Sequence, residues 1–322
     1  MATLQPPVTP RDKMIPKNAS SGPRVHPYFA LISGVIAVST GAIFARLAEA
    51  PALVIAAYRV GLATMILAPL AFWKVRGEIR HLSRNDIILS IISGIFLALH
   101  FAFWISSLDH TSVANSVVLV NTNPIWVALM TPVITGERMN RASFFSIAIS
   151  VVGVCIIGAD DIATGNAALW GDFLALIGSV CAAIYLLLGR RLRQKLSLLA
   201  YIFVCYASAA VILWLVVLLM QLPIRGFSNS TWAAFGAMAL FTQLVGHTSY
   251  NWALKWVSTG LIAVSLLGEP IGSTLLAYFI FDEGLTWMKV IGGVLILTAI
   301  YLAAINEKEK RNTGATGHVF WN

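Results

Sequence analysis

Long runs of apolar residues, separated by short polar or charged interruptions, make up most of the chain. A membrane-spanning α-helix needs roughly 20 apolar residues in a row, because each residue advances about 1.5 Å through a hydrocarbon core about 30 Å thick. The pattern therefore predicts ten transmembrane helices, at residues 28–45, 52–73, 87–108, 112–135, 141–159, 167–189, 198–222, 231–254, 259–281 and 286–305.

The composition excludes a soluble globular protein. Of the 322 residues, 58% are hydrophobic and only 11% are charged, whereas an ordinary soluble domain has roughly 25% charged residues. The chain is therefore predicted to be an all-α integral membrane protein in the lipid bilayer. Residues 1–27 lack the apolar region and cleavage site of a signal peptide. We expect a disordered cytoplasmic tail at 1–27 and a cytoplasmic C-terminal tail at 306–322.

Basic residues are distributed unevenly between alternate interruptions. If the N-terminus lies inside, the inner segments hold 18 Lys and Arg residues, and the outer side holds only Arg46, Arg225 and Lys289. Cytoplasmic loops carry the excess of positive charge in membrane proteins. The split predicts both termini in the cytoplasm and an even number of spans. It also accounts for the net charge of +8 without a nucleic-acid partner.

An internal repeat emerges when the chain is aligned on itself at an offset of 146 residues. Pro124 then falls on Pro270, and Glu137 falls on Glu283. Each half holds five spans, and an odd number forces the two copies to enter the membrane from opposite sides. We therefore expect two inverted five-helix repeats, at 28–159 and 167–305, around a central cavity.

These features resemble the drug/metabolite transporter superfamily, in its EamA-domain branch, over residues 28–305. Within that branch the chain most resembles bacterial aromatic amino-acid exporters of the YddG type. The resemblance implies gradient-linked or facilitative export by alternating access across the bacterial inner membrane. The first half departs from the pattern, with Asn123 where the second has Glu269. The matching residues are Tyr58-Arg59, Asn123-Pro124 through Gly136-Glu137, Glu269-Pro270 through Asp282-Glu283, and Gly292-Gly293.

Polar residues lie on one face of several spans. Lipid cannot satisfy their hydrogen bonds, so each face must meet protein or water. We expect them to line a shared substrate cavity, with helix packing as the alternative. In span eight they are Gln243, His247, Tyr250 and Asn251; in span three, His100, Phe103 and Trp104; in span four, Asn115, Asn123 and Trp126.

Two ionisable residues fall within spans. Glu269 lies near the middle of span nine. Three roles fit an acid at that depth: a proton site, a partner for a substrate amino group, or a structural acid bonded to a neighbouring helix. Arg59 lies in span two and either extends toward the membrane surface or pairs with Glu49 or Glu269. Aromatic residues such as Trp104 and Tyr250 offer stacking surface, while amide and imidazole groups bind polar atoms. The combination fits a small zwitterionic metabolite.

No enzyme motif of the HExxH or GxSxG kind occurs, and no nucleotide-binding GxxxxGK[ST]. The cysteines Cys155, Cys181 and Cys205 lie far apart, so we expect no disulfide, metal or cofactor. A channel would need rings of like charge or a carbonyl filter. The sequence favours a secondary carrier of amino acids over a carrier of another metabolite or drug, a channel or an intramembrane enzyme. It does not determine the oligomeric state.

Overall fold

The computed structural model describes residues 23, 25–111, 113–136, 141–158, 166–282 and 286–312, and these residues form helices and connecting turns with no strand among them. The helices are α1 (Pro27–Leu47), α2 (Ala52–Lys74), α3 (Arg76–Arg80), α4 (Arg84–Ser107), α5 (Val113–Val120), α6 (Asn123–Ile134), α7 (Arg141–Gly158), α8 (Asn166–Arg193), α9 (Leu198–Leu219), α10 (Asn229–Ala237), a π-helical segment (Met238–His247), α11 (Thr248–Ala253), α12 (Thr259–Leu266), α13 (Gly268–Phe281) and α14 (Trp287–Asn312).

Six of the helical stretches in these ranges are long and apolar enough to cross a membrane: Pro27–Leu47, Ala52–Lys74, Arg84–Ser107, Leu169–Arg193, Leu198–Leu219 and Thr259–Phe281. Shorter apolar helices cover Asn123–Ile134, Arg141–Gly153 and Val290–Asn306. The prediction of an all-helical membrane fold is confirmed. The number of ten spans, and the inward orientation of both termini, stay predictions.

Proline breaks the predicted fourth and ninth spans into two helices each. Pro124 is in the first turn of α6, directly after α5 ends at Val120, and Pro270 is in the first turn of α13, directly after α12 ends at Leu266. Proline has no N–H to donate to the carbonyl four residues earlier, which is Val120 for one and Leu266 for the other. The local chemistry of proline thus fixes where both helices are interrupted.

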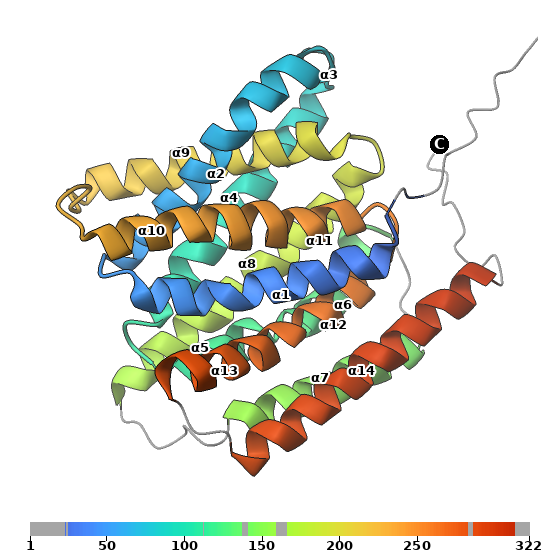
Figure 1. Ribbon diagram of the computed structural model, residues 1–322. Helices are drawn as coiled ribbons and strands as arrows, with labels where there is room; N and C mark the ends of the chain where they lie inside the picture. Colours follow the sequence, from blue (N-terminus) through green and yellow to red (C-terminus); the bar gives the residue numbers. More distant parts are fainter. Residues whose placement is uncertain are drawn as a thin grey trace, which may run out of the picture.

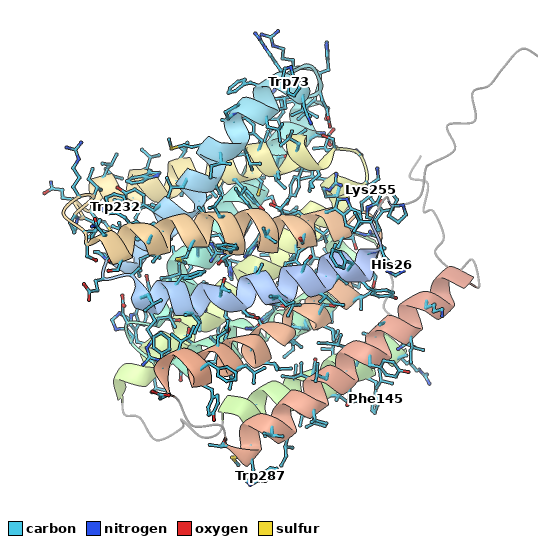
Figure 2. All side chains as sticks on the ribbon, viewed as in Figure 1. His26, Trp73, Phe145, Trp232, Lys255 and Trp287 are labelled. Atoms are coloured by element: carbon cyan, nitrogen blue, oxygen red, sulfur yellow. The ribbon has the colours of Figure 1, made fainter. Side chains whose placement is uncertain are left out.

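The eighth predicted span is one continuous helical stretch from α10 through the π-helical segment to α11. Figure 1 shows this stretch in orange, lying beside α1, and it packs against α1 and α2. His26, before α1, and Lys255, after α11, lie at one end of the bundle and Trp232 lies at the other. The two neighbouring helices therefore run antiparallel (Figure 2).

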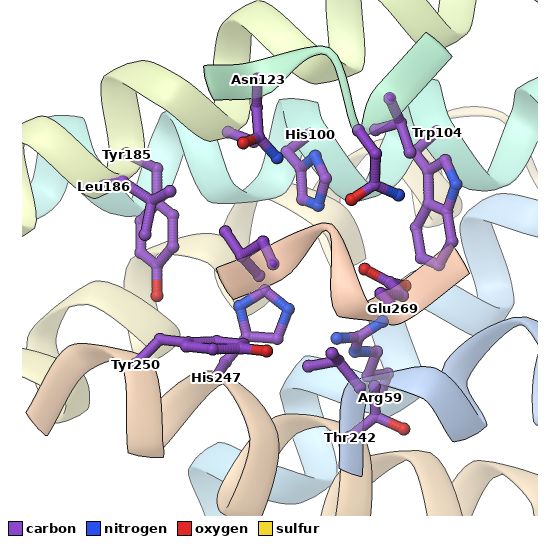
Figure 3. A pocket seen from close by; sticks show the side chains of 15 residues that line it. Arg59, His100, Trp104, Asn123, Tyr185, Leu186, Thr242, His247, Tyr250 and Glu269 are labelled. Carbon is purple, nitrogen blue, oxygen red and sulfur yellow. The ribbon is translucent and has the colours of Figure 1, made fainter. Parts of the chain in front are cut away.

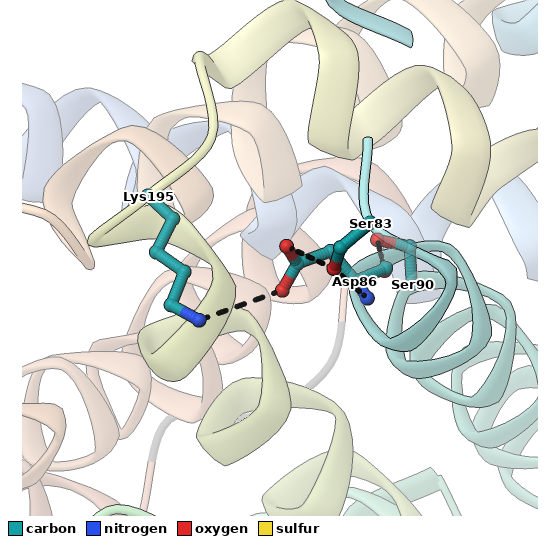
Figure 4. A network of polar contacts seen from close by, with 4 residues as sticks. All are labelled: Ser83, Asp86, Ser90 and Lys195. Atoms are coloured by element: carbon teal, nitrogen blue, oxygen red, sulfur yellow. Dashed lines mark hydrogen bonds and ion pairs between the residues drawn. The ribbon is translucent and has the colours of Figure 1, made fainter. Parts of the chain in front are cut away.

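Serine residues begin several helices. Each accepts a hydrogen bond on its side-chain oxygen from the backbone N–H three residues later, which satisfies one of the unpaired donors of the first turn. Ser83 does this for α4, Ser197 for α9, Ser228 for α10 and Ser258 for α12. At the start of α4, Asp86 also pairs with Lys195, which follows α8, at 3.7 Å (Figure 4). The ends of α4 and α8 are joined there.

Arginines at the end of α8 bind the end of α11. Arg190 donates to the carbonyls of Leu254 and Val257, and Arg193 donates through Nε to the carbonyl of Asn251 at 3.0 Å. The last carbonyls of a helix have no partner within it, and a basic side chain there is also favoured by the helix dipole. These bonds hold α8 and α11 in a fixed relation.

Glycine allows the closest helix contacts. A Cβ added at Gly94 of α4 would clash with the Cys205 carbonyl of α9 and lie 2.7 Å from the Ser208 Cβ. A Cβ at Gly153 of α7 would lie 2.7 Å from the Gly292 carbonyl of α14. Small residues permit this backbone approach between membrane helices. Figure 1 shows α7 and α14 side by side at the lower edge of the bundle.

Large apolar side chains cover the outside of the bundle. Trp73 at the end of α2 is 81% exposed and Trp287 at the start of α14 is 80% exposed, and both project from the periphery in Figure 2. Apolar surface of this extent is costly in water and is satisfied by lipid. The outer surface is therefore that of a membrane protein, and polar groups are concentrated inside.

We predict that Gly94→Val destabilises the protein, because its side chain has no room between α4 and α9. Overpacking of this kind costs about 1–3 kcal/mol. The melting temperature in detergent should fall by several degrees. Gly236→Ala is the matched control, since a Cβ there meets no atom within 4 Å. Equal melting temperatures for the two variants would contradict the close contact.

Candidate functional site

A buried arginine lies at the centre of the bundle. Arg59 of α2 is 1% exposed. Its Nε donates a hydrogen bond to the Gln243 Oε1 at 3.0 Å. Its guanidinium carbon lies 4.0 Å from the centre of the Phe101 ring, a cation–π contact. Contacts from the π-helical segment and from α4 therefore hold the side chain in one position.

The adjacent residue, Tyr58, turns away from this centre. Its hydroxyl donates to the Ile224 carbonyl at 2.7 Å, and its ring stacks on Phe235 at 4.6 Å between centroids. The Tyr58-Arg59 pair therefore anchors α2 on one face while it presents a positive charge to the interior on the other.

Arg59 borders a small cavity. The cavity contains about 40 Å³ of space for the centres of water molecules, which is room for a few waters. Figure 3 shows side chains converging on it from α2, α4, α8, α13 and the π-helical segment. The polar and aromatic residues that line it are Arg59, His100, Trp104, Asn121, Asn123, Tyr185, Thr242, His247, Tyr250 and Glu269.

The two proline breaks lie at this cavity. Val120 and Leu266 both line it. Their carbonyls lie four residues before a proline, which has no N–H to donate to them. Asn123 and Glu269 stand directly before the two prolines and line the cavity as well. Both halves of the chain thus contribute the residues at a helix interruption, including a polar side chain, to the same place. Interrupted helices are tolerated within a membrane where they face protein or a wet cavity.

The structure brings together most of the predicted site residues. His100, Trp104, Asn123, His247, Tyr250 and Glu269 line the cavity. Phe103 is half-buried and lies outside the lining. Trp126 packs instead against a separate apolar cluster that includes Val127 and Leu187. Asn115 is on α5, and its side chain lies outside the described residues, as do Glu137 and Glu283.

Span eight divides its polar residues between two roles. His247 and Tyr250 line the cavity, whereas Gln243 and Asn251 are fully buried beside it. The Asn251 Nδ2 donates to the Tyr185 hydroxyl at 2.6 Å and the Tyr206 hydroxyl at 3.2 Å. Cavity lining and helix packing, the two alternatives left open by the sequence, therefore occur on the same helix.

Hydrogen bonds and ring contacts fix the cavity wall on α4. The His100 Nδ1 lies 3.0 Å from the Gly178 carbonyl of α8. The His100 ring is nearly parallel to Trp104, with centroids 6.0 Å apart. Gly178 permits this approach, because a Cβ there would lie 3.3 Å from the Trp104 backbone nitrogen. The α4–α8 contact thus sets the orientation of two aromatic side chains at the cavity.

Several buried polar atoms at the cavity have no hydrogen-bond partner among the described residues. They are the Arg59 Nη1, the Trp104 Nε1, the Asn123 Oδ1 and the Tyr250 hydroxyl. A buried polar group without a partner costs about 1–3 kcal/mol. The four residues that carry these atoms all line the cavity, so a solute or water bound there is the nearest source of partners. The chemistry fits reversible binding of a small polar molecule.

Some lining residues were not among the predicted site residues. They are Asn121, Tyr185 and Thr242. Arg59 also lines the cavity, whereas the sequence left open whether it extends to the membrane surface or pairs with Glu49 or Glu269. Asn121 precedes Asn123 by two positions, a spacing that a regular helix would place on different faces. The chain turns at 121–122 between α5 and α6, which brings both side chains to one place. The sequence pattern did not show this interruption of the helix, so Asn121 was not predicted as a site residue.

Comparison with known proteins identifies the family. Residues 27–159 and 169–305 match the EamA-like transporter family. The chain belongs to this family. The expected EamA resemblance is confirmed, and this EamA-like protein is a transporter and not an enzyme. Export of aromatic amino acids stays a prediction.

Relatives of this EamA-like transporter are described as transporters in several organisms. An uncharacterized transporter of Archaeoglobus fulgidus is 24% identical over 79% of this chain and 88% of the relative. The uncharacterized transporter YyaM of Bacillus subtilis is 25% identical over 77% and 83%. The uncharacterized inner membrane transporter YedA of Escherichia coli K12 is 24% identical over 80% and 83%. They support a multi-pass protein of the inner membrane.

A solved crystal structure has the same fold as this transporter. It superposes with a TM-score of 0.72 at 18% sequence identity, over 88% of this chain and 98% of the other. At this identity the likeness concerns the fold alone.

The division of span eight predicts different effects for two substitutions. Asn251→Ala should lower the melting temperature in detergent by several degrees, because the Tyr185 and Tyr206 hydroxyls lose a partner worth about 1 kcal/mol each. His247→Ala should leave the melting temperature within about 2 °C of the wild type and reduce transport, because its ring lines the cavity. Equal destabilisation by both would contradict this division.

Proposed function

We propose that this protein is a secondary transporter that exports small amino acids, neutral or aromatic, across the inner membrane. The observation that carries the proposal is a half-buried carboxyl group, that of Glu269, in a cavity that the aromatic side chains of Trp104 and Tyr250 also line. The carboxylate and the carbonyls freed by Pro124 and Pro270 attract an ammonium group. The aromatic rings offer a stacking surface for an apolar or aromatic side chain.

Alternating access between two inverted repeats is the proposed mechanism. The family matches the chain twice, in two segments of similar length, and each segment contributes a proline-broken helix to the cavity. Such broken helices at a repeat interface are typical of secondary transporters. The cavity has only about 40 Å³ of space for the centres of water molecules, so entry of an amino acid requires the surrounding helices to separate, first toward one side of the membrane and then toward the other.

The small size of the cavity also favours a carrier over a channel, because a channel keeps a continuous path for its ion. The alternative within the family is a carrier of another metabolite or of a drug. A drug site is lined mainly by apolar surface with a few polar groups. The presence of both Arg59 and Glu269 in the lining of this cavity favours a small substrate with charged groups of its own.

Transport of labelled amino acids into proteoliposomes tests the proposed substrate class. We expect flux of phenylalanine, tryptophan, methionine or threonine above that of empty vesicles. If none of the four moves faster through protein-containing vesicles than through empty ones, the amino-acid proposal is wrong.

Glu269→Gln removes the charge while it keeps the shape of the side chain. We expect at least a tenfold loss of amino-acid flux, because the substrate ammonium loses its carboxylate partner. If Glu269 also exchanges a proton, the flux of the wild type will respond to an imposed pH gradient and that of the variant will not. Glu49→Gln is the matched control, since Glu49 is exposed at the end of α1. Equal flux in both variants would leave Glu269 with a structural role only.

A further inference from the structure

The burial of Arg59 is not explained by its contacts with protein. It is the eighth residue of α2, roughly 10 Å along the helix from its start, and its side chain is 1% exposed. Its charge persists, because arginine is not deprotonated in proteins. A charge inside a membrane is retained where it faces a cavity or a partner.

The guanidinium has more donors than the described residues use. It carries five N–H donors. The Nε–H binds the Gln243 Oε1, and Phe101 contacts the guanidinium carbon. The Nη1 is buried without a hydrogen-bond partner among the described residues. Glu269 lines the same cavity, but in the part of the chain that the structure describes no hydrogen bond or ion pair joins it to Arg59.

The other unpaired polar atoms around Arg59 are mostly donors as well. The Gln243 Nε2, the Trp104 Nε1 and the Tyr250 hydroxyl are buried without partners among the described residues, as is the Nη1. An ionised carboxylate only accepts hydrogen bonds and offers about four sites for them. The Asn123 Oδ1 is an unpaired acceptor at the same cavity, so donors outnumber acceptors among these atoms. An excess of buried donors around a fixed positive charge is complementary to a carboxylate.

We propose that Arg59 binds the carboxylate of the substrate and that Gln243 positions the guanidinium for this contact. The proposal rests on the proposed transport function and specifies its substrate class: a small molecule that carries a carboxylate as well as an amine. In Figure 3 Arg59 and Glu269 reach the cavity from α2 and α13. The substrate places its carboxylate at Arg59 and its ammonium group at Glu269, so one molecule satisfies both charges.

The proposal makes a free carboxylate a requirement for binding. Amines without a carboxylate leave the Arg59 donors unpaired at a desolvated site, which costs binding affinity. A site built to bind a polar group rejects an analogue that lacks it far more strongly than an apolar pocket rejects a change of size. Lipophilic cations are therefore excluded from the cavity on chemical grounds.

Calorimetric binding to the purified full-length protein tests this requirement with three probes: phenylalanine, phenylalanine amide, which lacks the carboxylate charge, and 3-phenylpropionate, which lacks the amine. We expect phenylalanine amide to bind the wild type at least tenfold more weakly than phenylalanine. In Arg59→Gln the two should bind with equal, weak affinity, and 3-phenylpropionate should not bind. Arg59→Lys should recover part of the preference, because it keeps the charge without the paired donors.

A second variant covers the case in which Arg59→Gln does not fold. Gln243→Glu places a carboxylate against Arg59, so it should keep the melting temperature at or above that of the wild type while it abolishes binding of both carboxylate probes. Gln221→Glu adds the same charge at an exposed position and should leave binding unchanged.

Two results would overturn the carboxylate site. One is a wild-type protein that binds neither carboxylate probe, and the other is an unchanged ratio of phenylalanine to amide affinity in Arg59→Gln or Gln243→Glu. The proposed amino-acid transport fails by a different result, which is the absence of flux in proteoliposomes. Binding of 3-phenylpropionate that depends on Arg59, without amino-acid flux, would retain the carboxylate site and reject amino-acid transport.

Discussion

A permanent positive charge inside an apolar bundle constrains the arrangement of the surrounding helices. Arg59 reaches the interior from α2 and must be held by groups on other helices, since lipid offers none. Gln243 of the π-helical segment and Phe101 of α4 contact it directly, and Glu269 of α13 lines the same cavity. Four elements that are distant in the sequence are thereby brought to one point.

The polar interior has one part in which side chains are linked by hydrogen bonds and another in which several donors are unpaired. On one side, Asn251 joins Tyr185 and Tyr206, and Arg193 binds the Asn251 carbonyl, so α8, α9 and α11 are linked by buried hydrogen bonds. On the other side, the Trp104 Nε1, the Tyr250 hydroxyl and the Arg59 Nη1 have no partner among the described residues. A carrier needs both, because a fixed framework orients the site and unpaired groups gain free energy only when substrate binds.

The broken helices connect this site to the expected motion. Proline interrupts the backbone bonds at Val120 and Leu266, and both residues border the cavity. Short helices on either side of such a break can change their angle without the loss of a regular hydrogen bond, which makes these positions suitable hinges. The same chemical feature therefore leaves carbonyls without a helical partner and weakens the helix beside the cavity.

The sequence alone determined the membrane class and the helical character of the apolar stretches, because hydrophobicity acts over a few neighbouring residues. Spans four and nine were each predicted as one helix, and the structure divides both near Pro124 and Pro270, where the proline N–H is missing. The sequence also placed the polar groups of span eight on one side of a helix. Only the tertiary structure decided that His247 and Tyr250 reach the cavity while Gln243 and Asn251 are bound within the bundle. That division depends on partners from α2, α8 and α9, and on a π-helical segment whose i→i+5 bonds depart from the 3.6-residue period. The partner of Arg59 was undetermined for the same reason: a local pattern shows that a charge is buried, and only the packing of distant helices shows which groups surround it.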